Sequence, residues 1–332
     1  MAVDHLYGMT VKLFGSHAEP PFEAASELDA VWGRHWGCNN DVGRLRTVLM
    51  HRPGAEFGII DPSKRIESIG SFGDVQAGWY FQSDTIPELK AMQAQHDALV
   101  DALQAQGVEV VMLTGVGDHR FKSCYTRDSS FAINGGVIVC RMAPRMRRGE
   151  ERTATQTLAA LGVPILRTIH SNGLMEGGSV AWINSKNAAI GRSIRVNDEG
   201  IAQVVDVLQR QGVSVHVVDL CGYSIHIDGV FLMIDTDLAL VNAAQLPYRF
   251  LCLLKELKIR TVEIDPDDDP WIINGLAVAP GRVLMPQGLS AKTRTQLEQN
   301  HIDIIEIPYD AMHHNGGGIH CSTCPLIRDA VE

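Results

Sequence analysis

The hydrophobic and polar positions of this chain follow two periods, which succeed one another in the same order five times. Each time, apolar residues three or four positions apart, the spacing of one helix face, lead into a short run typical of a β-strand. The five helix–strand pairs are predicted at residues 88–107 and 108–116, 151–162 and 163–170, 200–212 and 213–220, 248–257 and 258–265, and 292–300 and 301–309. A glycine follows each of the first three helices, where glycine commonly ends a helix.

Further apolar strands come between these pairs, at residues 131–142, 179–193, 230–242 and 275–286. The Asn-Gly and Pro-Gly dipeptides within them are typical of hairpin turns. The last unit lacks such strands at the end of the sequence, and the apolar segment 44–54 could supply them. The chain therefore consists of repeated units that each combine a hairpin, a helix and a final strand.

The strand starts recur at intervals of roughly 45–55 residues, a period typical of propeller-like or ring architectures. We therefore predict an α/β fold of five ββαβ units around a pseudo-fivefold axis, forming a single domain over residues 1–332. An open α/β sheet built from similar units is the alternative. Residues 1–43 are expected to form an N-terminal extension.

Residues 54–86 lie outside the repeat and contain the glycine-broken stretch GSFGDVQAGWYFQSDTI at 70–86. Long loops of this kind are often lids over a functional site. Trp79, Tyr80 and Phe81 would then shape the substrate pocket. A packed connection between two elements is the alternative interpretation.

Composition and charge narrow the class of protein. With 45% hydrophobic and 20% charged residues, the chain is typical of a soluble globular protein. Its net charge of −10 argues against a nucleic-acid or membrane partner, since both need clustered basic residues. No apolar stretch approaches the ~20 residues of a membrane span, and the N-terminus lacks the pattern of a signal peptide. Seven scattered cysteines indicate a reducing, cytoplasmic setting rather than a disulfide framework.

In a ring of such units, the segments that follow the helix-associated strands should meet at the centre. These segments read CYTRDSSF (124–131), MEGGS (175–179), SIHID (224–228), WIIN (271–274) and NGGGIHCST (315–323). Four of them carry a chemically reactive or charged side chain at a similar register: Asp128, Glu176, His226 with Asp228, and Cys321. Strand propensity does not explain acidic residues at these places, so we expect them to form a site.

The residue types in this set favour one kind of chemistry. A cysteine thiolate is a nucleophile, and a histidine can serve it as general acid and base, so Cys321 and His226 are suited to covalent catalysis. Three converging carboxylates suit a planar cation such as a guanidinium, whose N–H groups match carboxylates in pairs. The bound cation would also lower the pKa of Cys321. We therefore expect sulfur to attack the central carbon of a guanidine or amidine.

The Cys321-x-x-Cys324 motif has two other possible roles. With His313, His314 or His320 it could bind zinc, although the sequence contains no second Cys-x-x-Cys or paired histidine motif. A thioredoxin-like redox pair would stand at the start of a helix that follows a strand early in the sequence, whereas Cys321 and Cys324 lie near the end of the 332 residues. We interpret Cys321 as a single reactive thiolate and Cys324 as a neighbour in the site wall.

The motifs TRDSSF, MEGGS, HID and GGGIHCSTCP, in this order, resemble the guanidine-modifying superfamily with the pentein fold. This superfamily includes arginine deiminases, dimethylarginine dimethylaminohydrolases, agmatine deiminases and amidinotransferases. The resemblance runs from VLMHRPG near residue 48 to HCSTCP. It implies that Cys321 is the nucleophile and His226 the general acid and base.

The resemblance also implies a substrate-binding role for further side chains. Asp128 and Asp228 would bind the guanidinium, and Glu176 would hold the guanidinium and support His226. By spacing, Arg147 and Arg195 fall near the arginines that bind the substrate's α-carboxylate in arginine deiminases. A solvated basic turn is the alternative for the segment around Arg147.

The implied activity is hydrolysis of arginine or an arginine derivative through an S-alkylthiouronium intermediate. The products would be a ureido compound and ammonia or an amine, with no metal or organic cofactor, and a homodimer would be usual. Amidino transfer to an acceptor amine is the alternative, since HCSTC resembles glycine amidinotransferases, whereas Glu176 favours hydrolysis. A non-catalytic pentein binding protein is a third possibility, but it would have no need of these side chains.

Overall fold

A computed structural model describes residues 5, 8–9, 20–117 and 120–331 of the chain. Five of its sheets are built alike: the first two strands pair antiparallel, and a third strand runs parallel to the middle one. Four of these sheets are β6 (Ser130–Ile133), β7 (Gly136–Val139) and β8 (Ile165–Thr168); β9 (Val180–Asn184), β10 (Asn187–Arg192) and β11 (Ser214–Asp219); β12 (Phe231–Asp235), β13 (Leu238–Val241) and β14 (Arg260–Glu263); and β15 (Leu276–Ala279), β16 (Arg282–Pro286) and β17 (Asp303–Ile307).

The fifth sheet joins segments from opposite ends of the sequence. It consists of β18 (Cys324–Arg328), β1 (Leu45–Met50) and β5 (Glu109–Met112). β1 pairs antiparallel with β18, so that Leu49 lies opposite Cys324, and it pairs parallel with β5. The prediction that segment 44–54 completes the last unit is therefore confirmed.

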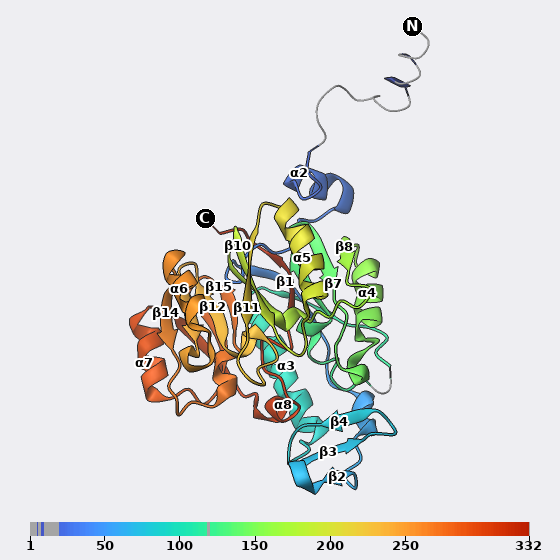
Figure 1. Cartoon of the computed structure of the whole chain (residues 1–332), viewed down its shortest axis with the longest axis vertical. Helices are drawn as coiled ribbons and strands as arrows, with labels where there is room; N and C mark the ends of the chain where they lie inside the picture. The colour runs from blue at the N-terminus through green and yellow to red at the C-terminus, as the bar shows by residue number, and fades with distance from the viewer. Residues whose placement is uncertain (1–4, 6–7, 10–19, 118–119, 332) are drawn as a thin grey trace.

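A helix precedes the third strand in every one of these sheets. The helices are α3 (Leu89–Ala105), α4 (Glu150–Ala160), α5 (Asp198–Arg210), α6 (Tyr248–Glu256) and α7 (Ala291–Gln299). Each lies on its predicted segment, and Figure 1 shows α4, α5, α6 and α7 on the outside of the sheets. Apolar side chains on one face of each helix are fully buried, such as Leu99 of α3, Leu208 of α5 and Leu254 of α6. The predicted α/β class is confirmed.

The five helices end in the same backbone conformation. Gly107, Gly162 and Gly212 follow α3, α4 and α5 with φ angles of 78°, 77° and 72°, in the left-handed region that favours glycine. At the equivalent place after α6 and α7, Lys258 and His301 both have a φ of 61°. The sequence predicted this helix ending only after α3, α4 and α5, where the residue in the left-handed conformation is glycine.

A small sixth sheet lies outside the repeat, between β1 and α3. Its antiparallel strands are β2 (Arg65–Ile66), β3 (Ser71–Asp74) and β4 (Trp79–Phe81). Figure 1 shows this sheet projecting at one end of the molecule, beside α8 (Asp310–His314). The expectation of an irregular loop at 70–86 is therefore wrong, because the glycine-broken pattern concealed two short strands. Trp79 and Phe81 are buried, whereas Tyr80 is 40% exposed.

The predicted N-terminal extension, residues 1–43, lies partly outside the described residues. Its described part contains α2 (Ala25–Glu27) and, further on, buried side chains that pack into the body of the fold: Trp36, Cys38, Asn40 and Val42. Among the residues that the structure describes, no helix combines the length and the apolar character that crossing a membrane requires.

Candidate active site

The five segments that were expected to meet each lie directly before the first strand of a sheet. Four of them form single 3₁₀ turns: η4 (Thr126–Asp128), η6 (Gly177–Ser179), η7 (Ile227–Gly229) and η9 (Pro270–Ile273). The fifth is the turn at 315–323, before β18. Each segment is hydrogen-bonded to the next, and the last segment is hydrogen-bonded to the first, so the five form a closed cycle. In chain order, the donors and acceptors are Gly178 N to Asp128 Oδ1, Ser179 Oγ to Ile225 O, Asn274 Nδ2 to Asp228 O, and His320 N to Asn274 O; Arg127 N to Cys321 O closes the cycle.

A cavity of about 170 Å³ opens onto this cycle of turns. Six of the seven side chains predicted from the sequence line it: Asp128, Arg147, Arg195, His226, Asp228 and Cys321. The seventh, Glu176, is fully buried behind His226. The structure thus brings all the predicted site residues together around one cavity.

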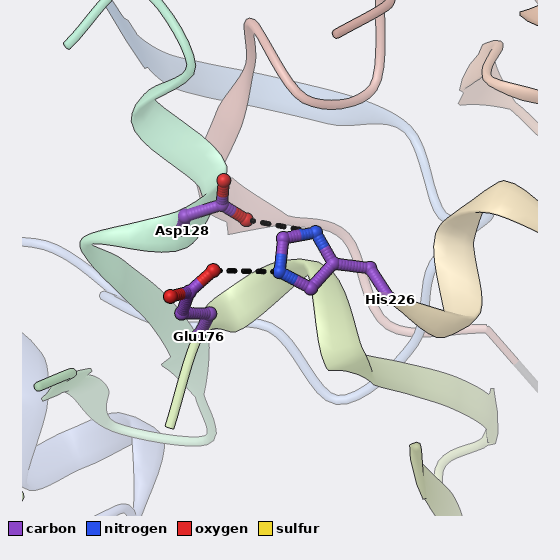
Figure 2. Close-up of side chains that lie close together, drawn as sticks. All are labelled: Asp128, Glu176 and His226. Atoms are coloured by element: carbon purple, nitrogen blue, oxygen red, sulfur yellow. Dashed lines mark hydrogen bonds and ion pairs between the residues drawn. The ribbon is translucent and has the colours of Figure 1, made fainter. Parts of the chain in front are cut away.

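His226 lies between two carboxylates (Figure 2). Its Nε2 is 2.8 Å from Glu176 Oε2, and its Nδ1 is 3.5 Å from Asp128 Oδ1. Burial disfavours the charged imidazolium, yet the two carboxylates outweigh burial and raise the pKa of His226 to about 9. Burial alone would raise the pKa of Glu176, but the hydrogen bond from His226 and the nearby Arg195 charge lower it. At neutral pH the pair is therefore an imidazolium and a carboxylate.

The glycines of MEGGS allow this close approach. A Cβ atom on Gly178 would lie 2.8 Å from both His226 Nδ1 and Asp128 Oδ1, which is closer than real Cβ contacts come. The Gly178 N–H donates to Asp128 Oδ1 at 3.2 Å. Any side chain at this position would push the histidine and the carboxylate apart, so the glycine is required by the geometry of the site.

Arg147 is buried and is not part of a solvated basic turn. Its Nη1 donates to Asp128 Oδ2 at 2.6 Å. Its Nε and Nη2 donate to the carboxylate of Glu150 at 3.0 Å and 2.8 Å, and Nη2 also reaches Tyr125 O at 3.3 Å. Most of the guanidinium is therefore engaged with protein acceptors.

Arg195 is the less engaged of the two arginines. Its Nη1 donates to Glu176 Oε2 at 2.9 Å, and its Nη2 lies 3.4 Å from the hydroxyl of Tyr80 on β4. Tyr80 also lines the cavity, so the small sheet contributes to the wall of the site. Arg195 has N–H groups left for a ligand, since these two contacts use only part of its fork.

Asp228 is held by a histidine that the sequence analysis considered only as a zinc ligand. His320 Nδ1 lies 2.8 Å from Asp228 Oδ2, and His320 Nε2 lies 2.5 Å from Arg127 Nη2. Because a guanidinium can only donate, Nε2 must accept, and the proton on Nδ1 is donated to Asp228. Burial and the Arg127 charge lower the pKa of His320, which agrees with a neutral ring.

Cys321 follows a glycine run that the packing requires. A Cβ on Gly317 would overlap the ring of Tyr125, and a Cβ on Gly318 would overlap the side chain of Asn274. The Cys321 N–H donates to Asn274 Oδ1 at 3.2 Å, and its Sγ lies 3.8 Å from Asp228 Oδ2. Burial, together with the charges of Asp228 and Asp128, raises the pKa of Cys321 well above its ordinary value. The thiol is therefore protonated while no cation is bound.

Cys324 does not belong to the site wall, contrary to the interpretation from sequence. It is fully buried in β18, where its Sγ donates to Ser130 O at 3.2 Å, and it packs beside Leu49 and Leu326. Only two residues, Ser322 and Thr323, separate the two cysteines in sequence, but only Cys321 lines the cavity. Cys324 is a core residue.

A metal ion has one conceivable place among the described residues. The potential donor atoms of Asp128, Glu176 and His226 lie within 4.8 Å of one another, and the cysteine pair belongs to no such group. Asp128 and Glu176 are already paired with Arg147 and Arg195, and His226 carries a proton between them. A metal ion would have to displace these cations, so we assign it no role.

Comparison with known proteins identifies the family of this chain. A sequence model of the family described as "N,N dimethylarginine dimethylhydrolase, eukaryotic" matches residues 75–269, more than half of the chain. The chain belongs to this family. It is therefore a member of the guanidine-modifying superfamily, as the motifs indicated. Among individual relatives, the uncharacterized protein YkgA of Bacillus subtilis is 28% identical over 293 residues, covering 88% of this chain and 95% of YkgA.

The chain is also similar to characterised enzymes in sequence and in fold. The N(G),N(G)-dimethylarginine dimethylaminohydrolase of Pseudomonas aeruginosa is 26% identical over 238 residues, covering 71% of this chain and 88% of that protein. Its solved structure with citrulline matches 86% of this chain and all of that chain, with a TM-score of 0.67 at 19% identity. The inosamine-phosphate amidinotransferase of Streptomyces griseus matches 90% of this chain and 99% of its own, with a TM-score of 0.69 at 17% identity. The family member described here thus has the fold that hydrolases and amidinotransferases share.

Sequence reasoning missed several side chains around the family's motif residues. The sequence could have pointed to three of them. Asn274 ends the WIIN segment, and Arg127 and His320 directly precede Asp128 and Cys321. Their roles depend on contacts between different units, which adjacency alone does not show. Glu150 and Lys122 gave no signal, because a glutamate at a helix start and a lysine in a loop are common on protein surfaces.

Proposed function

We propose that this protein is a cysteine-dependent hydrolase of a guanidino compound, arginine or an arginine derivative, and that it releases a ureido product with ammonia or an amine. The observation that carries the proposal is the convergence of Cys321, an imidazolium at His226 and the carboxylates of Asp128 and Asp228 on one cavity. The hydrolytic members of its family act on the same kind of C–N bond, which supports the proposal.

The guanidinium of the substrate binds between Asp128 and Asp228. Each carboxylate has acceptor capacity to spare. Asp128 already accepts from Arg147 Nη1 and from the Gly178 N–H, while the described contacts of Asp228 use only its Oδ2. The cation offsets the negative charges that raise the pKa of Cys321, so substrate binding promotes formation of the thiolate and releases its proton.

In the first half of the reaction, the thiolate of Cys321 adds to the guanidinium carbon and a C–S bond forms. His226 gives a proton to the departing nitrogen as the C–N bond breaks. Nδ1 is the nitrogen suited to this transfer, since its contact with Asp128 is long, whereas Nε2 is held by Glu176. The enzyme then carries an S-alkylthiouronium group on Cys321.

In the second half, the neutral imidazole of His226 accepts a proton from water, and the resulting hydroxide adds to the same carbon. The C–S bond breaks, the ureido product leaves, and the thiolate and the imidazolium are restored. The carboxylate of Glu176 stabilises the imidazolium each time it forms. No step requires a metal or an organic cofactor.

The fold supports this assignment as a single catalytic domain. In our proposal the five similar sheets surround the site as the units of a pentein propeller, and the turns that carry the site side chains lie at its centre. The sheet β2–β4, within residues 54–86, acts as a lid, because Tyr80 and Gln82 line the cavity.

The test is turnover of a panel of arginine, methylated arginines, agmatine and guanidino acids, without acceptor amine or metal. Ammonia or amine and ureido product should appear with the native protein and not with Cys321→Ser. Product that forms only after glycine or another amine is added would establish amidino transfer instead, the activity of structurally similar proteins. Absence of both reactions over the whole panel would contradict the proposed function.

A further inference from the structure

Lys122 lines the same cavity and has no part in the reaction proposed above. It precedes η4, beside Phe121, and its Nζ donates to the carbonyl oxygen of Asn315. The ammonium lies over two aromatic rings, 5.3 Å from the centroid of Phe81 on β4 and 5.2 Å from that of Phe121. It is thus held in a defined place at the cavity wall.

The charge of this ammonium is not balanced by the protein. Within the described part of the chain, no carboxylate oxygen lies within the 4.0 Å of an ion pair to Lys122. Its charged neighbours are chiefly cations, Arg147 and Arg195, while Glu150 is paired with Arg147 and the Cys124 thiol is neutral. Burial and these cations lower the pKa of Lys122 to about 7. Near neutral pH Lys122 is therefore present both as the ammonium and as the neutral amine, and a bound anion would favour the ammonium. No side chain of the protein supplies that anion, so Lys122 is suited to bind one from a ligand.

The two arginines of the cavity differ in what they can offer an anion. Arg147 uses its Nε, its Nη2 and one hydrogen of Nη1 on Glu150, Tyr125 and Asp128. Little of its fork is left, so it serves chiefly to hold Asp128. Arg195 retains free N–H groups, and it adjoins β4 through Tyr80 just as Lys122 adjoins β4 through Phe81.

We propose that Lys122, with Arg195, binds the carboxylate of the substrate beside β4, and that this pair restricts the enzyme to guanidino acids. This inference rests on the proposed function and specifies its substrate: a molecule with a guanidinium at one end and a carboxylate at the other. A decarboxylated analogue would leave Lys122 without a counter-charge, since Arg195 is paired with Glu176, and an analogue with an amine there would add a further cation. Lys122 thus takes over part of the carboxylate-binding role that the resemblance implied for Arg147.

The test uses Cys321→Ser protein, which can bind substrate without turnover, and isothermal titration with arginine and agmatine. Arginine should bind at least about tenfold more tightly than agmatine, since a charge-assisted contact to the carboxylate is at stake. Adding Lys122→Met should weaken arginine about tenfold and leave agmatine within about twofold. Lys122→Arg should preserve the preference, and Lys186→Met, at an exposed turn, should change neither.

Equal effects of Lys122→Met on both ligands, no effect on either, or no binding of arginine would overturn the inference. Turnover of the native Cys321 protein is measured separately, with Lys122→Met expected to raise KM and to change kcat by less than about threefold. Guanidine turnover that is indifferent to Lys122 would leave the proposed function standing without this inference. Preferential binding of the ligand with a carboxylate, without turnover of any guanidine, would support this inference and contradict the proposed function. Thermal unfolding of each variant establishes that it is folded.

Discussion

Arg147 donates to Asp128 across 2.6 Å in a buried ion pair, at the place where the substrate guanidinium is expected to bind. The protein's own guanidinium thus orients the carboxylate that is to receive the guanidinium of the substrate. Glu150 holds the other side of Arg147, so the three side chains form one buried network. The contacts that stabilise this buried network therefore also position the Asp128 carboxylate for the proposed reaction.

Replacing Arg147 by methionine should destabilise the protein strongly. The change leaves Asp128 and Glu150 buried without their counter-charge, a loss of about 3–5 kcal/mol in the free energy of unfolding. Urea denaturation of the variant measures this loss. Arg147→Lys, which retains the charge without the planar fork, should fall in between. A methionine variant as stable as the native protein would contradict the buried network.

Gly178→Ala should impair catalysis much more than stability. Its new methyl group would displace the His226 ring and the Asp128 carboxylate, and a shift of this kind costs on the order of a hundredfold in kcat. Steady-state kinetics measures the effect. Gly58→Ala, where an added Cβ meets nothing within 4 Å, is the matched control and should retain activity. Similar kcat values for both variants would show that the close approach at Gly178 has no catalytic importance.

Cys321 should react selectively with cationic reagents. Its thiol is protonated in the free protein, so neutral iodoacetamide should alkylate it slowly, whereas chloroacetamidine brings a cation that lowers its pKa. Mass spectrometry gives both rates for Cys321 and for the exposed Cys221 in the same sample. The ratio of the cationic to the neutral rate should be much higher at Cys321. Equal ratios at the two cysteines would refute the electrostatic account of the nucleophile.

The charged His226 should make part of the stability depend on pH. Its pKa rises from about 6.5 in the unfolded chain to about 9 in the folded protein. The folded state therefore binds the proton more strongly, and this contribution is complete below about pH 6.5 and lost as the pH rises through about 9. Its size is on the order of 3 kcal/mol.

Unfolding free energies of the native protein and of His226→Gln at intervals between these pH values measure the contribution. The native protein should lose stability over this window relative to the variant. Parallel curves for the two proteins would mean that His226 is not charged in the folded state.

Glycine at the ends of α6 and α7 should stabilise the protein. Lys258 and His301 adopt a left-handed backbone that costs a residue with a side chain roughly 1 kcal/mol. Lys258→Gly and His301→Gly should therefore each raise the free energy of unfolding by up to about 1 kcal/mol, although glycine also makes the unfolded chain more flexible. Gly212→Ala at the matching place should lower it. A loss of stability in both glycine variants would contradict the observed backbone.

The repeat and the main site residues could be predicted from the sequence because both are local signals. A helix face has its own period, and the motif residues stand at the same place in each unit, before an apolar strand. For the same reason the C-terminal strand and segment 44–54 could be assigned to one unit. The position of Cys324 was predicted wrongly because β18 begins at this residue and is buried along its whole length, whereas Cys321 lies in the turn before the strand.

The remaining features depend on contacts between units, which no local pattern encodes. The neutral tautomer of His320 follows from Arg127, far away in the sequence. The engagement of Arg147 with Glu150 was hidden because a basic run beside acidic residues reads as surface. Strands β3 and β4 are short and interrupted by glycine, so their alternation is too brief to recognise.

The pairing of β1 with β18 has a consequence for the order of events during synthesis. β1 leaves the ribosome long before its partner β18, which comes shortly after Cys321 in the sequence. Until β18 emerges, β1 has an open edge, and Cys321 is not yet in place. Contacts between residues so distant in sequence form slowly. A nascent or truncated chain that stops before Cys321 therefore has the carboxylates and the histidine of the site but lacks the thiol of the proposed reaction, and we expect activity only after β18 has paired with β1.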